Sequence, residues 1–91
     1  MTLKETIAMV EAFHNAFGIE NRHKPTAELS KAQQELRYRL MAEENDEYLE
    51  AVKNNDLVEI ADALGDQLYI LCGTILKHGL QDKIAAVFKE I

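Results

Sequence analysis

Apolar residues recur at helical spacing along most of the chain, and this periodicity restricts the possible folds more than any other feature. Only one proline is present, Pro25, and no segment alternates apolar and polar residues over the length of a strand. Because proline interrupts helices and alternation marks half-buried strands, both observations favour helices. The sequence predicts an all-α fold of the four-helix-bundle type, with residues 1–91 forming a single domain.

Capping residues divide this periodicity into separate helices. Thr2 and Glu5 have the spacing of a capping box, and so do Asp56 and Glu59. Gly79 is a stop signal after the third periodic segment. The predicted helices cover residues 2–17, a segment that starts between 26 and 30 and ends at about 53, residues 57–78, and residues 81–91.

Composition restricts the class of partner. Apolar residues make up 47% of the 91 residues, too many for a disordered chain. A formal net charge of -6 argues against binding to a nucleic acid polymer or to an anionic membrane. No signal pattern or membrane-length apolar segment is present, so we expect a cytoplasmic protein. The single cysteine, Cys72, lies in an apolar run and is predicted to be a buried core residue.

Acidic residues of the second helix occupy positions where a bundle normally places leucine. At about 100° per residue, one stripe of that helix contains Leu29, Gln33, Leu36, Leu40, Glu44, Glu47 and Ala51. A carboxylate in such a place is costly unless a positive charge neutralises it. A hard cation such as Mg²⁺ or Mn²⁺ prefers oxygen ligands and is the simplest candidate.

The third helix carries a second acidic group. Its apolar seam contains Leu57, Ala61, Leu64, Leu68, Leu71 and Ile75, and the opposite side carries Glu59, Asp62 and Asp66. If the second and third helices form an antiparallel hairpin at residues 54–56, Glu47 and Asp62 lie at similar distances from its turn. We therefore expect Glu44, Glu47 and Asp62 to converge in one shielded place.

Two short motifs point to a known family. Glu43, Glu44 and Glu47 form the pattern E-E-x-x-E, and Glu59 and Asp62 form the following E-x-x-D. In this order, and within residues 37–79, they resemble the MazG-like all-α NTP pyrophosphohydrolases, which include dUTPase, dCTPase and phosphoribosyl-ATP pyrophosphatase branches. The segment from residue 13 to residue 18, Phe-His-x-x-Phe-Gly, is similar to a phage and bacterial sub-branch.

The resemblance implies a helical bundle that works as a homodimer or as a dimer of dimers. It implies Mg²⁺-dependent cleavage of a nucleoside triphosphate to a monophosphate and pyrophosphate. Carried over by position, the metal ligands are Glu44, Glu47, Glu59 and Asp62. Glu43 is either a further ligand or the group that orients the attacking water, so Glu43 and Glu44 are the predicted catalytic residues.

Asp66 is a further candidate ligand. Some relatives place the last acid of the motif in the context G-D-x-L-[FY], which Gly65, Asp66, Leu68 and Tyr69 match. In that register Ala63 replaces the preceding glutamate, so the sequence favours Asp62 and keeps Asp66 as an alternative.

Binding of a triphosphate needs cations from the protein as well. Lys77, Lys53 and Arg37 are candidates for a phosphate clamp. Phe17 is a candidate for stacking on a nucleobase, although core packing is the simpler interpretation of Phe13 and Phe17. No Walker-type glycine loop is present, so the chain is not a P-loop enzyme.

The leading hypothesis is a pyrophosphohydrolase that removes unwanted NTPs or dNTPs, with a second subunit completing its pocket. Three alternatives stay open: a non-catalytic regulatory module that binds metal or nucleotide, a phosphoribosyl-ATP pyrophosphatase, and a purely structural helical dimer. The divergent first helix argues against the phosphoribosyl-ATP pyrophosphatase. A di-iron bundle is disfavoured because the Glu-x-x-His motif is absent from both acidic helices.

Overall fold

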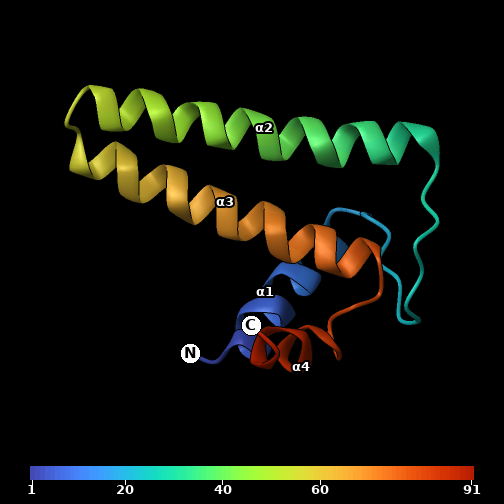
Figure 1. Ribbon diagram of the computed structural model, residues 1–91. Coiled ribbons are helices and arrows are strands. Elements are labelled where there is room, and N and C mark those ends of the chain that lie inside the picture. Colours follow the sequence, from blue (N-terminus) through green and yellow to red (C-terminus); the bar gives the residue numbers. More distant parts are fainter. The chain divides into compact units, whose positions relative to one another are not determined.

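The computed structural model describes residues 1–91. Its regular elements are all helices, which confirms the all-α prediction (Figure 1). Its helices are α1 (Leu3–Ala16), α2 (Lys31–Lys53), α3 (Leu57–Lys77) and α4 (Ile84–Lys89). The chain divides into two compact units, and α3 continues from one into the other. Unit 1 contains Met1–Leu29 and Cys72–Ile91, and unit 2 contains Ser30–Leu71.

The predicted caps place most helix ends correctly. Thr2 and Glu5 form a complete capping box, in which each side chain accepts a hydrogen bond from the other residue's backbone amide. Ser30 caps α2, and the Asp56 carboxylate accepts a hydrogen bond of 3.1 Å from the amide of Glu59 in α3. The start of α4 differs from the prediction, because residues 81–83 form a turn and the helix begins at Ile84. Side-chain acceptors therefore explain three helix starts, whereas α4 has no side-chain cap.

Unit 2 is the expected helical hairpin. The α2 helix and residues 57–71 of α3 run antiparallel in Figure 1, and a short turn joins them. Asn55 in that turn has a φ of 51°, a left-handed conformation that asparagine tolerates. The buried residues of this unit are Arg37, Ala51, Ala63 and Ile70.

The apolar seam of α3 lies mostly on the exposed side of the hairpin. Leu57, Leu64, Leu68 and Leu71 are between 46% and 77% exposed. Two helices can cover only one face of each other, and α3 uses the face of Ala63 and Ile70 for α2. The hairpin therefore presents a row of leucines that the chain's own helices leave uncovered.

Unit 1 contains the most deeply buried apolar residues of the chain. Ile7 and Val10 of α1 are buried, and so are Cys72, Ile75 and Leu76 at the C-terminal end of α3. Cys72 is 1% exposed, which confirms its predicted place in a core. Burial raises the pKa of the Cys72 thiol, which is consistent with an inert core side chain.

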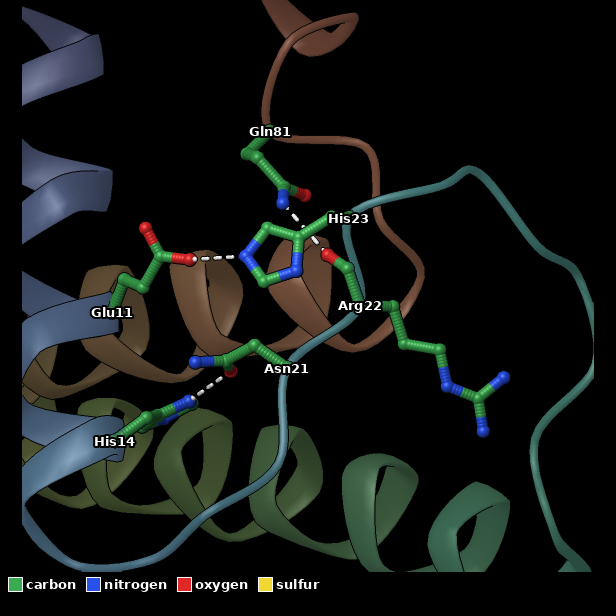
Figure 2. A network of polar contacts seen from close by, with 6 residues as sticks. All are labelled: Glu11, His14, Asn21, Arg22, His23 and Gln81. Carbon is green, nitrogen blue, oxygen red and sulfur yellow. Dashed lines mark hydrogen bonds and ion pairs between the residues drawn. The ribbon is translucent and has the colours of Figure 1, made fainter.

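Residues 17–29 of unit 1 form a strap that is fastened to the C-terminal end of α3. The backbone amide of Arg22 donates to Leu76 (3.0 Å), and that of Thr26 donates to His78 (2.9 Å). Figure 2 shows side-chain contacts that hold the same strap, and they link His14 to Asn21, His23 to Glu11, and Gln81 to the carbonyl of Arg22. The amide of Thr26 thus gives a partner to the carbonyl of His78, directly after the end of α3. None of the four helices combines the length and apolar content needed to cross a bilayer.

Candidate metal centre

Three carboxylates from the two helices of unit 2 converge. Glu44 and Glu47 of α2 and Asp66 of α3 each have an oxygen within 4.8 Å of the others. Glu44 and Glu47 share a helix face because they are three residues apart, and Asp66 approaches from the facing helix. Glu44 is half-buried, whereas Glu47 and Asp66 are exposed, so the prediction of a shielded place was wrong: two helices alone leave this face open to solvent. We call these residues the carboxylate cluster.

One oxygen atom of the carboxylate cluster is in an environment that suits a bound cation. Glu44 Oε2 is buried and has no hydrogen-bond partner. Desolvation raises the pKa of Glu44, and the neighbouring carboxylates of Glu47, Asp66 and Glu43 raise it further. An unpartnered acceptor among negative groups is costly, and an oxygen-preferring divalent cation such as Mg²⁺ removes that cost. The residues therefore fit the metal that the sequence predicted.

The predicted ligands Glu59 and Asp62 lie beside the carboxylate cluster rather than inside it. They line a hollow of about 340 Å³, together with Glu47 and Asp66. The remaining lining residues are Glu50, Ala51, Asn54, Asp56 and Ala63. The geometry thus places Asp66, not the favoured Asp62, with Glu44 and Glu47, although metal binding by either residue stays a prediction. We call this space the acidic hollow.

Other predicted site residues of unit 2 take different positions. The Glu43 side chain is 57% exposed, and one of its oxygens lies 3.8 Å from Arg39 Nε. Lys53 is exposed in the last turn of α2. Arg37 is buried, and its Nη2 donates a hydrogen bond of 3.0 Å to the backbone carbonyl of Ile70. A buried guanidinium bound to a backbone carbonyl is an unexpected environment for a phosphate-binding arginine.

Two predicted substrate-binding residues belong to unit 1. Lys77 is buried, and its ammonium group donates to the carbonyl of Glu20 in the strap. Phe17 ends α1 and is 69% exposed, with its ring centroid 4.5 Å from that of Phe13. The simpler core interpretation was therefore wrong for Phe17 and also for Phe13, which is 46% exposed. Contact of Lys77 and Phe17 with substrate stays a prediction.

The sequence analysis missed a polar link between the helices that carry the carboxylate cluster. Gln67 Nε2 donates to Asn45 Oδ1 over 3.3 Å. Each of these amides directly follows an acid of the cluster, Asp66 and Glu44 respectively. An amide residue directly after an acid in both helices was the signal that could have predicted this link.

The match to a family model identifies the class of protein. The model described as phosphoribosyl-ATP pyrophosphohydrolase matches residues 10–91. The chain belongs to the phosphoribosyl-ATP pyrophosphohydrolase family. It is therefore a pyrophosphohydrolase, a hydrolase that acts on a nucleotide. No curated protein and no solved structure matches the chain.

Family membership confirms the resemblance to MazG-like NTP pyrophosphohydrolases drawn from the acidic motifs. The matched region contains α2 and α3 completely, and with them the carboxylate cluster. Hydrolases of this kind typically use divalent metals, which agrees with the acidic cluster in unit 2. The phage and bacterial sub-branch stays a prediction.

Removing the charge of Glu44 is expected to stabilise the metal-free protein at neutral pH. Because the pKa of Glu44 is raised in the folded state, the protonated carboxyl stabilises the fold relative to the ionised one. This stabilisation is fully present below the pKa of Glu44 in the unfolded chain, and it is lost as the pH rises through the pKa in the folded protein. Glu44→Gln is therefore expected to raise the Tm by no more than a few degrees, because solvent around this partly exposed cluster screens the repulsion. Thermal melts in EDTA at pH 7.5 measure the increase, which is expected to shrink towards pH 4.

Glu35→Gln provides the matched control, because Glu35 is an exposed glutamate of the same helix. Its Tm in EDTA is expected to equal that of the wild type. Added Mg²⁺ is expected to raise the Tm of the wild type more than that of Glu44→Gln, because a ligand stabilises the state that binds it. A lower Tm for Glu44→Gln than for the wild type in EDTA would contradict this account.

Proposed function

We propose that this pyrophosphohydrolase uses Mg²⁺, with Mn²⁺ as a substitute, to cleave a nucleoside triphosphate into a monophosphate and pyrophosphate at the carboxylate cluster. The observation that carries the proposal is the buried, unpartnered Oε2 of Glu44 within a group of three carboxylates from two helices. Such a group is costly without a cation, and a bound cation would also neutralise the charge of a triphosphate.

The residues of the cluster supply the parts of this reaction. Glu44, Glu47 and Asp66 would hold the cations, which would neutralise phosphoryl oxygens and make a water molecule more acidic. The water oxygen attacks the α-phosphorus, the bond from that phosphorus to the bridging oxygen breaks, and pyrophosphate leaves. A carboxylate must accept the proton of the water, and Glu44 is the first candidate because it belongs to the cluster. Glu43, one residue away, is the second candidate for this role.

Two substrate classes fit this chemistry. NTPs and dNTPs follow from the resemblance of the motifs, and their hydrolysis would serve to remove unwanted nucleotides. Phosphoribosyl-ATP, which carries the same triphosphate group, is favoured by the description of the matching family model. The match begins at residue 10, so the first turns of α1 lie outside it.

A pyrophosphate-release panel tests the proposed function. The panel contains the NTPs, the dNTPs and phosphoribosyl-ATP, each assayed with Mg²⁺, with Mn²⁺ and with EDTA. Metal-dependent release from NTPs or dNTPs supports the main proposal, and release from phosphoribosyl-ATP alone supports the second. Metal-dependent thermal stabilisation with no turnover of any substrate would instead indicate the regulatory module.

We also propose that the protein acts as a homodimer or homotetramer in which unit 2 contacts a second copy. The charged side chains of α3 lie within about 60° of one another around the helix, so the leucine seam carries no charge. The adjoining side of α2 is also uncharged between residues 34 and 52, where Tyr38, Met41, Leu49 and Val52 are exposed. A hollow of about 520 Å³, lined by Tyr38, Met41, Ala42, Asn45, Gln67, Ile70 and Leu71, lies on the same side.

Such an uncharged surface is unusual on a protein that carries a net charge of -6, and it suits contact between two like-charged copies. Leu68→Glu is expected to convert the oligomer to a monomer, because each copy would bury an unpaired carboxylate. Light scattering after size exclusion gives the mass. Val58→Glu is the control, since Val58 is an exposed residue of α3 at the border of its acidic side. A monomeric wild type would contradict the proposal.

The cytoplasmic location stays a prediction.

A further inference from the structure

Arg37 lies in the same stripe of α2 as the carboxylate cluster. Seven residues, or about 10 Å along the axis, separate it from Glu44, and their directions around the helix differ by only about 20°. Its partner Ile70 follows Asp66 by four residues, about 6 Å along α3. The hydrogen bond from Arg37 to Ile70 therefore links the two helices close to the point where their acids meet.

Apolar packing alone defines the register of this hairpin poorly. The buried residues of α2 are Arg37 and Ala51, and its leucines at positions 36 and 40 are only half-buried, so few apolar side chains of α2 are fixed against α3. A directional bond to one carbonyl permits a single register. The turn at residues 54–56 fixes one end of the hairpin, and the Arg37 bond fixes the other, with the carboxylate cluster between them.

The cluster itself opposes this arrangement. Its carboxylates repel one another when no cation is bound, and separation of α2 from α3 would relieve that repulsion. A link on the far side of the cluster from the turn resists the separation. A second polar link between the two helices, from Gln67 to Asn45, is longer at 3.3 Å and joins exposed side chains.

We propose that Arg37 is the positioning residue of the metal centre, whose buried hydrogen bond to Ile70 holds Glu44 and Glu47 of α2 in register with Asp66 of α3. This inference rests on the metal centre of the proposed function. It replaces direct phosphate binding as the role of Arg37, because the guanidinium is buried and engaged with a backbone carbonyl.

Titration of the full chain with Mn²⁺ in the absence of nucleotide tests the proposal, by calorimetry and by the electron paramagnetic resonance signal of bound Mn²⁺. Arg37→Met keeps the length of the side chain and removes its donors. Its affinity for Mn²⁺ is expected to fall about tenfold or more, as for loss of other groups that orient metal ligands. Arg37→Lys can still donate to Ile70, and we expect it to retain most of the affinity.

Arg39→Met is the matched control, since Arg39 is exposed on the same helix and pairs only with Glu43 at the surface. It is expected to bind Mn²⁺ within about twofold of the wild type. Far-UV circular dichroism and Tm show whether each variant folds, and replacement of a buried ion by an apolar side chain is often tolerated. If Arg37→Met does not fold, Arg37→Gln takes its place with the same expected loss of affinity.

Wild-type Mn²⁺ affinity in folded Arg37→Met would overturn the proposal. Unchanged metal affinity with a raised KM for the nucleotide would also overturn it, in favour of direct phosphate contact. A wild type that binds Mn²⁺ but hydrolyses none of the nucleotides would refute the proposed reaction and leave the role of Arg37 standing. A wild type that binds no Mn²⁺ would refute both.

Discussion

Asp66→Asn is expected to lower the rate of pyrophosphate release by about 100-fold or more. The substitution removes a negative ligand from a cluster that has three within 4.8 Å of one another. Loss of a metal-bound carboxylate forfeits several kcal/mol of transition-state stabilisation, and ~1.4 kcal/mol corresponds to tenfold in rate. Initial rates at saturating nucleotide and saturating Mg²⁺ measure the loss. Glu47→Gln is expected to behave in the same way.

Asp62→Asn and Asp46→Asn make this prediction specific. Asp62 lines the acidic hollow outside the carboxylate cluster, and its loss is expected to reduce the rate about tenfold by weakening the field around the metal. Asp46 is exposed and belongs neither to the cluster nor to the hollow, so Asp46→Asn should keep nearly full activity. If Asp62→Asn abolishes activity and Asp66→Asn retains it, Asp66 is not a ligand, and Asp62, which the motifs favour, is the correct assignment.

Gly79→Ala is expected to destabilise the fold by about 3 kcal/mol or more, which lowers Tm by roughly 12 °C or more. Gly79 has a φ of 65°, where an L side chain costs about 1–2 kcal/mol. A Cβ at this position would also overlap the backbone carbonyl of Lys24 in the strap. The strap would have to move away, and the hydrogen bond from Thr26 to the carbonyl of His78 would be lost with it.

Gly18→Ala separates the two causes. Gly18 has nearly the same conformation, with a φ of 69°, but no atom lies within 4 Å of the position of its Cβ. This variant is expected to lose only the backbone term of about 1–2 kcal/mol. Equal losses of Tm in the two variants, measured by thermal denaturation in the same buffer, would show that contact with the strap contributes nothing.

Local signals in the sequence were sufficient for the helices and for the candidate ligands. Thr2, Ser30 and Asp56 cap helices where their side chains can accept from a free amide, so the starts of α1, α2 and α3 followed from the residues themselves. The start of α4 did not, because it has no side-chain cap. The spacing of Glu44 and Glu47 placed both on one face of α2, as the structure has it.

Tertiary structure decided which acid of α3 completes the carboxylate cluster. Asp62 and Asp66 are four positions apart, and their directions around the helix differ by only about 40°, so a small rotation of α3 about its axis decides which of them faces Glu44. No local pattern fixes that rotation. It depends on burial of Ala63 and Ile70 against α2, and these contacts bring in Asp66.

The sequence by itself determined the helices, the acidic face of α2 and the pyrophosphohydrolase family, because propensity, capping and residue spacing act over a few neighbouring positions. Only the tertiary structure showed that Arg37 is bound to Ile70, that Lys77 is bound to Glu20, and that the α3 leucines are uncovered. Those facts depend on contacts between residues far apart in the chain, and spacing along one helix carries no information about what lies opposite it.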